Sequence, residues 1–494
     1  MLGMRSPLNL NLLCSVIYLL SISIIGVLAS QLAGFAQEPD TNYPSAPASH
    51  ELVSDESVSD ESASDESASN EPDADPVWQP PTLQWQPAEG AWQPIPPRRE
   101  DYGKIKVVWL AGSPYEMGVQ HGELLHDEIA SMGREIITTL NFFGQSLGLG
   151  RLSRRRSFPD IYEECRGLAA ATADIGMTTE GCMVLALGDV YQEYFTYLLP
   201  DILFNVGCAH FIATGDATAD GRLYHGWTLD NDGGPIPYWA DNPTILVRQP
   251  DNGIPHVFIT VPGMVWPNGG FNADGIIVSN NTSHPAVYED LDLYGKSTVQ
   301  LMAQITQYAS TYDEAYEIMA TQNRMRSSLV IVSDAASGQA SVFELLGREM
   351  GVRELDENGL LYMTNHFAAP SMLGRDRSNE SSFNRFLSLQ QMLEPDGART
   401  RYGAINPEVI VGILRDRTNP HTFEVSPPDV KDDDASIGGN GSHRQVVFDP
   451  TGLRFWITNG EIEQPVPESP FVCFSMRDML GLPNAEPCSQ PVIN

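Results

Sequence analysis

The sequence predicts an α+β protein in which helices pack on the outside of antiparallel sheets. Helical patterns fill most of residues 114–198, whereas short strands dominate from Cys208 onward and the later helices come in pairs between groups of strands. Such blocks of like elements favour antiparallel sheets covered by helices over an alternating βαβ fold.

The first 36 residues have the features of an export signal. Arg5 is the only charged side chain, Leu12–Leu28 is apolar, and small residues follow up to Ala36. A transmembrane anchor is the alternative, but serines interrupt the apolar run and small residues close it. We therefore expect a cleaved signal peptide at residues 1–36 and a protein that is secreted or periplasmic, without stable membrane insertion.

An acidic, repetitive segment follows. Ser54–Ala68 holds three copies of a five-residue repeat, Ser-Asp-Glu-Ser followed by Val or Ala. Pro and Trp then alternate from Val77 to Pro97. Such a composition buries too little apolar surface to offset the entropy of ordering. Residues 37–100 are therefore expected to be a disordered acidic repeat and a Pro/Trp linker. The formal net charge of −35, to which this segment contributes, argues against a nucleic-acid partner.

The remaining chain has a globular composition. A strand at 104–110 should precede a helix that begins after Ser113, where Ser113 and Glu116 form a capping box, and that continues to about Leu140. The other expected helices are 159–171, 179–198, 297–308, 312–322, 377–394 and 407–415. The other expected strands are 208–214, 222–227, 244–248, 256–261, 275–280, 328–333, 340–346, 360–364, and the hairpin 443–449 with 453–459.

Five cysteines remain after signal removal, and in an oxidising compartment they tend to pair. Cys165 with Cys182 and Cys473 with Cys488 are the local options, although the sequence does not decide the connectivity. Those pairs would leave Cys208 as an odd thiol, which is unusual in a secreted protein.

A cysteine directly after Gly207 suits a specific chemistry. If the Gly207–Cys208 bond breaks, the new α-amine of Cys208 lies beside its thiol, and with a pKa near 7.7–8.0 it can act as the general base. Asp230, which follows the next strand, could orient that amine. The alternatives are that Cys208 is a buried small hydrophobe or a disulfide partner.

The same chemistry needs oxyanion donors and a positive charge. Residues 269–282 and Thr364-Asn365 place amides at strand ends, and Arg385 on a predicted helix could supply the charge. Each could equally be a turn, a strand end or a surface ion pair. The sequence has no Gly-x-Gly-x-x-Gly, Walker or His-Glu-x-x-His motif, so we expect no metal and no organic cofactor.

These residues occur in an order that resembles a known family. Over about residues 105–460 the chain is similar to the autoproteolytic acyltransferase and hydrolase family typified by isopenicillin-N (acyl-CoA:6-aminopenicillanic acid) acyltransferase, which is related to choloylglycine hydrolases within the N-terminal nucleophile (Ntn) hydrolase superfamily. The segments that carry the resemblance are Gly112–Gly122, Gly207–Cys208, Asp220–Gly226, Asp230, Pro262–Met264, Gly270–Gly275, Leu360–His366, Asn384–Phe386 and Val446–Pro450.

The resemblance implies a four-layer αββα sandwich with an N-terminal helical prosegment. It implies cleavage between Gly207 and Cys208, so that residues 101–207 become a light chain and residues 208–494 a heavy chain. The site residues implied are Cys208 as nucleophile, Asp230 beside the new amine, Asn365 and either Asn281 or Thr282 at the oxyanion, and Arg385.

One departure concerns the run Gly226-Trp-Thr-Leu-Asp230, where many relatives have Arg in place of Trp227. Either Arg385 suffices, or the pocket is more apolar, so Trp227 is expected to contact substrate. The expected activity is cleavage of an amide C–N bond in a small-molecule acyl amide, through a thioester that passes to water or an amine. The alternatives are a phospholipase B-like hydrolase of lipid amides or esters, and a non-catalytic binding protein that keeps the fold.

Overall fold

The computed structural model describes residues 78–88, 90–197, 206–231, 237–427, 435–438, 442–459, 469–483, 485 and 487–494. The predicted signal peptide, the acidic repeat and the first residue of the Pro/Trp segment lie outside the described residues. In the described part, no helix combines the length and the apolar character that crossing a bilayer requires.

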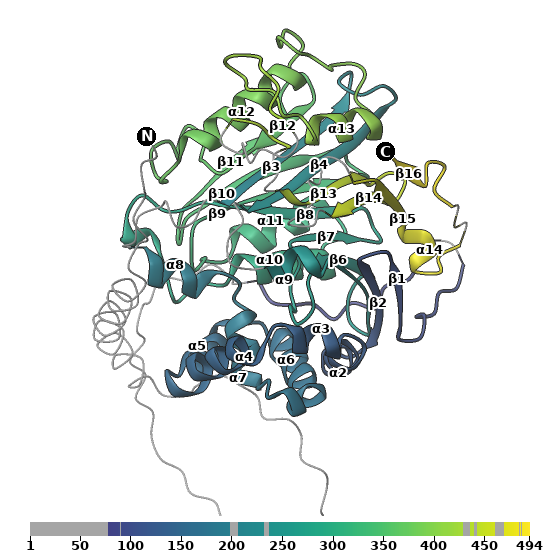
Figure 1. The fold of residues 1–494 in the computed structure, drawn as a ribbon. Helices are drawn as coiled ribbons and strands as arrows, with labels where there is room; N and C mark the ends of the chain where they lie inside the picture. The colour runs from purple at the N-terminus through teal and green to yellow at the C-terminus, as the bar shows by residue number, and fades with distance from the viewer. Residues whose placement is uncertain are drawn as a thin grey trace, which may run out of the picture. The chain divides into compact units, whose positions relative to one another are not determined.

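The described strands form two sheets (Figure 1). The nine-stranded sheet runs β1 (Arg98–Tyr102), β2 (Ile105–Gly112), β5 (Thr244–Pro250), β6 (His256–Thr260), β7 (Gly269–Asn272), β8 (Ile276–Thr282), β9 (Ser328–Asp334), β10 (Ala340–Leu345), β11 (Met350–Glu354). The seven-stranded sheet runs β12 (Leu360–Met363), β3 (Val206–Gly215), β4 (Gly221–Asn231), β13 (Ser442–Asp449), β14 (Arg454–Asn459), β15 (Phe471–Ser475), β16 (Val492–Ile493). Neighbouring strands are antiparallel except β2 and β5, which are parallel.

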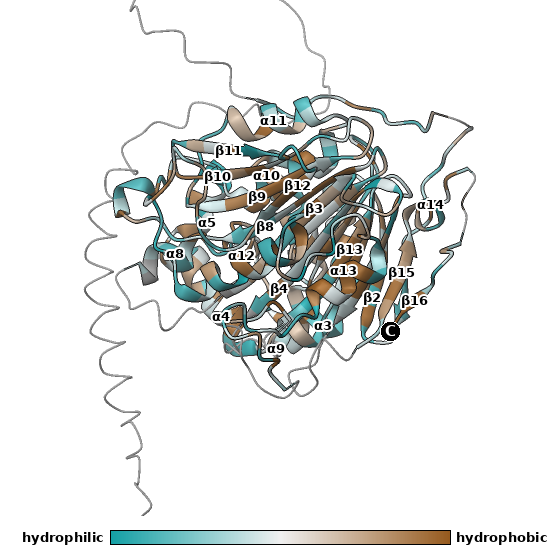
Figure 2. Cartoon of the chain, turned by 90° about the horizontal axis from the view of Figure 1, so that it is seen from above, coloured by the Kyte–Doolittle hydropathy of each residue, from teal (hydrophilic) through white to brown (hydrophobic). Residues whose placement is uncertain are grey.

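The two sheets pack face to face and helices cover their outer faces. One core cluster joins Trp227 and Phe448 of the seven-stranded sheet to Val247 and Phe271 of the other. The helices α10 (Thr298–Tyr308) and α11 (Tyr312–Ala320) pack on the nine-stranded sheet, and α12 (Glu380–Leu393) and α13 (Pro407–Leu414) pack on the seven-stranded sheet. In Figure 2 the strands are largely brown and the loops largely teal. The predicted αββα arrangement is confirmed.

The region predicted to be a prosegment, residues 101–207, is largely helical in its described part, as predicted, but its helices are shorter. They are α2 (Pro114–Leu124), α3 (His126–Ser131), α4 (Arg134–Asn141), a π-helical turn (Phe142–Ser146), α5 (Leu149–Arg156), α6 (Pro159–Ala171), a 3-10 turn (Ala173–Ile175), α7 (Thr179–Leu185) and α8 (Val190–Thr196). The predicted capping box at Ser113 and Glu116 is confirmed. The predicted helix to Leu140 is interrupted at Leu125 and at Gly133. The predicted helix 179–198 is interrupted near Gly188. Both Gly133 and Gly188 have positive φ, which ends a helix.

The later helices and strands agree with the predicted ranges to within a few residues, with some additions. Strands β1, β7, β11, β15 and β16 lie where no separate strand is predicted. The remaining short helices are α9 (Pro237–Asp241), a 3-10 turn (Tyr288–Asp290) and α14 (Met476–Met479). These pieces are too short for hydrophobic periodicity to identify.

Residues 78–97 lie along the sheet region and hydrogen-bond to it. Trp85 Nε1 donates to Asp274 Oδ1 at 2.8 Å, and Trp92 Nε1 donates to the Leu480 carbonyl at 2.7 Å. The Gln249 side chain exchanges two hydrogen bonds with the backbone of Ile95. The tryptophans of this segment therefore serve as contacts to the domain.

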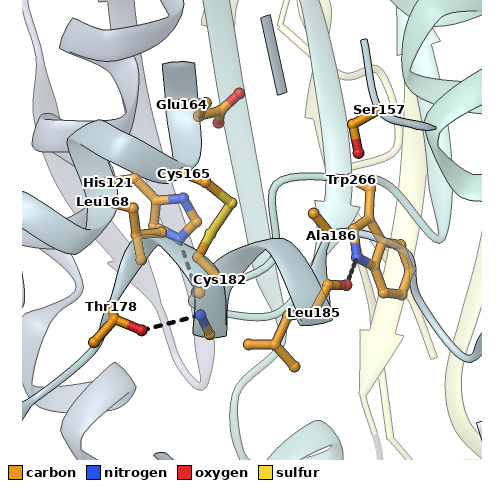
Figure 3. The surroundings of a disulfide bond; sticks show 12 residues. His121, Ser157, Glu164, Cys165, Leu168, Thr178, Cys182, Leu185, Ala186 and Trp266 are labelled. Atoms are coloured by element: carbon orange, nitrogen blue, oxygen red, sulfur yellow. Dashed lines mark hydrogen bonds between the residues drawn. A yellow bond between two sulfur atoms is a disulfide. The ribbon is translucent and has the colours of Figure 1, made fainter. Parts of the chain in front are cut away.

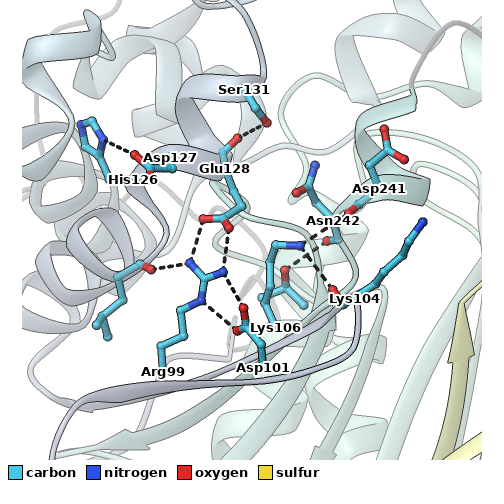
Figure 4. A network of polar contacts seen from close by, with 12 residues as sticks. Arg99, Asp101, Lys104, Lys106, His126, Asp127, Glu128, Ser131, Asp241 and Asn242 are labelled. Carbon is cyan, nitrogen blue, oxygen red and sulfur yellow. Dashed lines mark hydrogen bonds and ion pairs between the residues drawn. The ribbon is translucent and has the colours of Figure 1, made fainter.

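The prosegment is joined to the rest of the domain by strands and side chains. Its hairpin β1–β2 forms the edge of the nine-stranded sheet, and Arg99 of β1 bridges Asp101 and Glu128 (Figure 4). A disulfide between Cys165 and Cys182 links α6 to α7, and nearby Trp266 donates to the Leu185 carbonyl (Figure 3). The described cysteines thus form both predicted local pairs, the second being Cys473 with Cys488, and Cys208 is free.

A buried ion pair lies at the same junction. Glu164 of α6 and Arg248 of β5 are 1% and 2% exposed, and the guanidinium donates to both carboxylate oxygens at 2.5 and 2.7 Å. Arg248 Nε also lies 3.2 Å from His256 Nε2. Removal of one member of a buried pair leaves the other charge uncompensated, which is strongly destabilising.

We expect Arg248→Met to lower the free energy of unfolding by about 3–5 kcal/mol, because Glu164 then stays buried without its partner. Urea denaturation measures the change. The control is Arg166→Met, since Arg166 pairs with Glu163 on the surface and such pairs contribute at most about 1 kcal/mol. Equal losses in the two variants would contradict the expectation.

Candidate active site

Cys208 lies near the start of β3, which has β12 on one side and β4 on the other. Its side chain is 2% exposed. Alternate residues of a strand share a face, so Cys208 shares the face of His210, which contacts Ser279 of the opposite sheet. The thiol therefore faces the space between the two sheets.

The β3–β4 hairpin brings the predicted cleavage site to the predicted aspartate. In its register Gly207 lies opposite Asp230, and Cys208 lies opposite Leu229. A side-chain carbon added to Gly207 would lie 3.3 Å from the Asp230 Cβ, tighter than most such contacts. Glycine thus allows the chain before Cys208 to lie close against the carboxylate.

Two predicted residues hold the Cys208 backbone. Asn365, two residues after the end of β12, accepts a hydrogen bond from the Cys208 amide at 3.0 Å. Arg385, on the buried face of α12, donates to the Cys208 carbonyl and to Asn365 Oδ1, the latter at 2.9 Å. Strand pairing of β12 with β3 and the packing of α12 on the sheet bring these residues together.

The structure separates the roles of Asn281 and Thr282 at the end of β8. Asn281 is fully buried, and its Nδ2 lies 2.8 Å from the Thr364 carbonyl and 3.4 Å from the Cys208 carbonyl. Thr282 contributes its backbone carbonyl, which accepts from Asn365 Nδ2 at 2.8 Å. Successive side chains of a strand point to opposite faces, so Asn281 is the one that reaches Cys208.

Two hydroxyl groups that the motifs do not include hold Asp230. Thr228 and Ser442 each donate to Asp230 Oδ1 at 2.5 Å. Ser442 begins β13 and lies opposite Asp230. It stands one residue before the predicted strand at 443–449, so only the pairing of β13 with β4 reveals its role.

Trp227 lies apart from these contacts. It is fully buried between the sheets, stacked on His210 at a centroid distance of 5.6 Å. His210 Nδ1 in turn lies 3.0 Å from Ser279 Oγ and 3.2 Å from His225 Nε2. The structure gives Trp227 a packing role, and its contact with substrate stays a prediction.

The environment of Cys208 disfavours the thiolate in the continuous chain. Burial, together with the charge of Asp230, raises the pKa of the Cys208 thiol to about 12, although Arg385 and Asn365 act in the opposite direction. The thiol is therefore protonated at neutral pH in the continuous chain. Its reactivity is lost as the pH falls and gained as the pH rises toward 12.

In a sample that contains uncut chain, iodoacetamide should alkylate Cys208 roughly 1,000-fold more slowly at pH 7 than it alkylates free cysteine, because thiolate is the reactive form. The rate should rise about tenfold per pH unit up to pH 11. Intact mass follows cut and uncut chains separately in one sample. Rates equal to those of free cysteine at pH 7 would show that the thiol is not in this environment.

Comparison with known proteins adds a family match. Residues 237–460 match the family model described as acyl-coenzyme A:6-aminopenicillanic acid acyl-transferase. An uncharacterized protein of Archaeoglobus fulgidus is 25% identical over 304 residues, which cover 53% of this chain and 50% of that protein. The chain thus matches about half the length of this relative.

Solved structures with low similarity include three hydrolases. An N-acylethanolamine-hydrolyzing acid amidase ortholog from Caenorhabditis elegans is 15% identical, with a TM-score of 0.36, over 54% of this chain and 99% of that one. Penicillin V acylase from Agrobacterium tumefaciens is 13% identical, with a TM-score of 0.31, over 51% and 83%. A mutant conjugated bile acid hydrolase from Clostridium perfringens is 12% identical, with a TM-score of 0.33, over 55% and 93%.

The matched region begins after Cys208 and Asp230 but includes Asn281, Asn365 and Arg385, which the fold brings to Cys208. The resemblance to the acyl-coenzyme A:6-aminopenicillanic acid acyl-transferase family, predicted from the motifs, is thereby confirmed for residues 237–460.

Proposed function

We propose that this chain is a self-cleaving N-terminal-cysteine amidohydrolase or acyltransferase that acts on small acyl amides. The observation that carries the proposal is the setting of Cys208, whose free thiol directly follows Gly207. Gly207 lies opposite Asp230, and the backbone of Cys208 is hydrogen-bonded by Asn365 and Arg385. Polar groups from β4, β8, α12 and the residues after β12 converge on the backbone of Gly207 and Cys208, and such convergence is typical of a catalytic site.

The first step is attack by Cys208 on its own chain. The sulfur adds to the Gly207 carbonyl carbon, the C–N bond breaks, and the thiol proton passes to the departing nitrogen. Asp230 Oδ2 would lie 3.7 Å from a side-chain carbon built on Gly207, so this carboxylate can carry that proton. Water then hydrolyses the thioester, leaving a carboxylate on Gly207 and a free α-amine on Cys208.

In turnover the α-amine of Cys208 takes the thiol proton, and the thiolate adds to the carbonyl of a substrate amide. The Nδ2 groups of Asn281 and Asn365 are the donors available to the oxyanion. Collapse of the intermediate expels the amine, which takes the proton from the ammonium, and leaves an acyl thioester. Transfer of the acyl group to water or to another amine frees the thiol.

The two chains produced by cleavage should remain together. Residues before Gly207 contribute β1 and β2 to the nine-stranded sheet, and Glu164 pairs with Arg248 across the junction. Export is part of the proposal, supported by the apolar N-terminal segment and by two disulfides in the described residues.

Self-cleavage is tested by N-terminal sequencing and intact mass of the purified protein. We expect wild type to give a C-terminal chain that begins at Cys208, and Cys208→Ala to stay uncut because the nucleophile is gone. Asp230→Asn should cut more slowly, whereas the control Asp220→Asn, in the exposed turn of the same hairpin, should cut normally. An uncut wild type would sink the mechanism and favour a binding protein that keeps the fold.

The pH dependence of turnover reports the base. We expect kcat/KM for an acyl amide to rise about tenfold per pH unit below pH 7 and to level off near pH 8, because the unprotonated α-amine is required. An increase that continues toward pH 12 would assign the titration to the thiol alone and contradict the role of the amine.

A further inference from the structure

Arg444 is a buried arginine with no acidic partner among the residues that the structure describes. It lies on β13, 1% exposed, and in the described part of the chain its Nε and Nη1 have no hydrogen-bond partner. Burial lowers the pKa of Arg444 to about 10, and no acidic residue acts against that effect. An uncompensated buried cation is costly, so its retention calls for an explanation.

The other buried arginines of the described region are satisfied. Arg248 donates to a carboxylate, Arg326 pairs with Asp189, and Arg324 donates to backbone carbonyls. Arg385 donates to the Cys208 carbonyl. Arg444 is the exception among the buried arginines of the described residues, which leaves its guanidinium to be paired by an anion that these residues do not supply.

Strand register places Arg444 in the same row as the nucleophile. Cys208 lies opposite Leu229, and Leu229 lies opposite Arg444. Directly opposite residues of antiparallel strands share a face, so all three side chains point into the space between the sheets. Two interstrand spacings of about 4.8 Å separate the backbones of Cys208 and Arg444 by about 10 Å. Leu229, between them, is only partly buried.

We propose that Arg444 is a substrate-binding residue that pairs with an acidic oxygen group, a carboxylate, on the acyl amide processed at Cys208. The carboxylate would lie about two strands from the reacting carbonyl, with Leu229 beneath the intervening atoms. A guanidinium binds a carboxylate through two parallel hydrogen bonds. The proposal rests on the function proposed for Cys208 and narrows its substrates to acyl amides that carry an acid group at this spacing.

The first test is the stability of Arg444→Met beside Arg248→Met. Because no described carboxylate pairs with Arg444 and would be left uncompensated, we expect its replacement by a similar apolar side chain to keep or raise the unfolding midpoint. Arg248→Met, in contrast, should lower it. A comparable loss of stability in Arg444→Met would show a structural role and overturn the proposal.

The second test uses matched alkylating probes: ω-(iodoacetamido)alkanoic acids with three to six methylenes, and their carboxamides. Alkylation forms a bond from the Cys208 sulfur to carbon and releases iodide. In the cut wild-type enzyme we expect the acid to react faster than its amide, with a maximum at one chain length. The ratio should fall roughly 30-fold in Arg444→Met and recover in part in Arg444→Lys.

The control variant is Arg454→Met on the neighbouring strand β14, which should keep the wild-type ratio. Free acetate added with the carboxamide probe should not increase the alkylation rate, because only the alkyl chain of the acid probe places its carboxylate at Arg444. If the thiol is inert to both probes, the function proposed for Cys208 fails. The unreactive acetamido analogues then test Arg444, through the shift that each causes in the unfolding midpoint.

Two results would overturn the proposal for Arg444. One is an acid-to-amide ratio of alkylation rates that is unchanged in Arg444→Met, and the other is an equal midpoint shift with the acid and the amide analogue.

Discussion

The position of β3 inside the seven-stranded sheet is the constraint on which the candidate site depends. Paired with β12 on one side and β4 on the other, the strand holds the Gly207–Cys208 bond in a fixed place. Pairing with β4 puts Gly207 opposite Asp230, and pairing with β12 brings Asn365 to the Cys208 amide. The site is thus built on a rigid sheet, which keeps reacting groups within the narrow tolerances that catalysis demands.

Buried charge is distributed unevenly across the same sheets. At the junction of prosegment and core, Arg248 and Glu164 neutralise each other with two short hydrogen bonds, so this pair joins the parts of the chain on either side of Gly207. Arg444 has no such partner among the described residues, although it is buried as deeply. The Arg248 and Glu164 charges therefore neutralise each other, whereas the charge of Arg444 is the one that we propose a substrate carboxylate neutralises.

Polar side chains also continue into the core behind the thiol. His210, His225 and Ser279 form a buried hydrogen-bonded group beneath Cys208, and burial lowers the pKa of both histidines, so that they remain neutral. Trp227 stacks on His210 of this group. The charge beside Cys208 comes from Arg385, which approaches from α12.

The sequence by itself determined the α+β class, most strands and the later helices, and the odd thiol at Cys208. It also singled out Asp230, Asn365 and Arg385 as candidate site residues. These follow from hydrophobic periodicity, cysteine count and motif order, which are local in the chain. Only the tertiary structure decided that Asn281 rather than Thr282 faces Cys208, that Ser442 and Thr228 hold Asp230, and that Trp227 is buried in the core. Strand register and the packing of one sheet on the other fix these contacts, and neither can be read from a single segment. The same reason explains why nothing in the sequence indicated Arg444. Its burial without an acidic partner among the described residues follows from the pairing of β13 with β4 and the packing of the sheets.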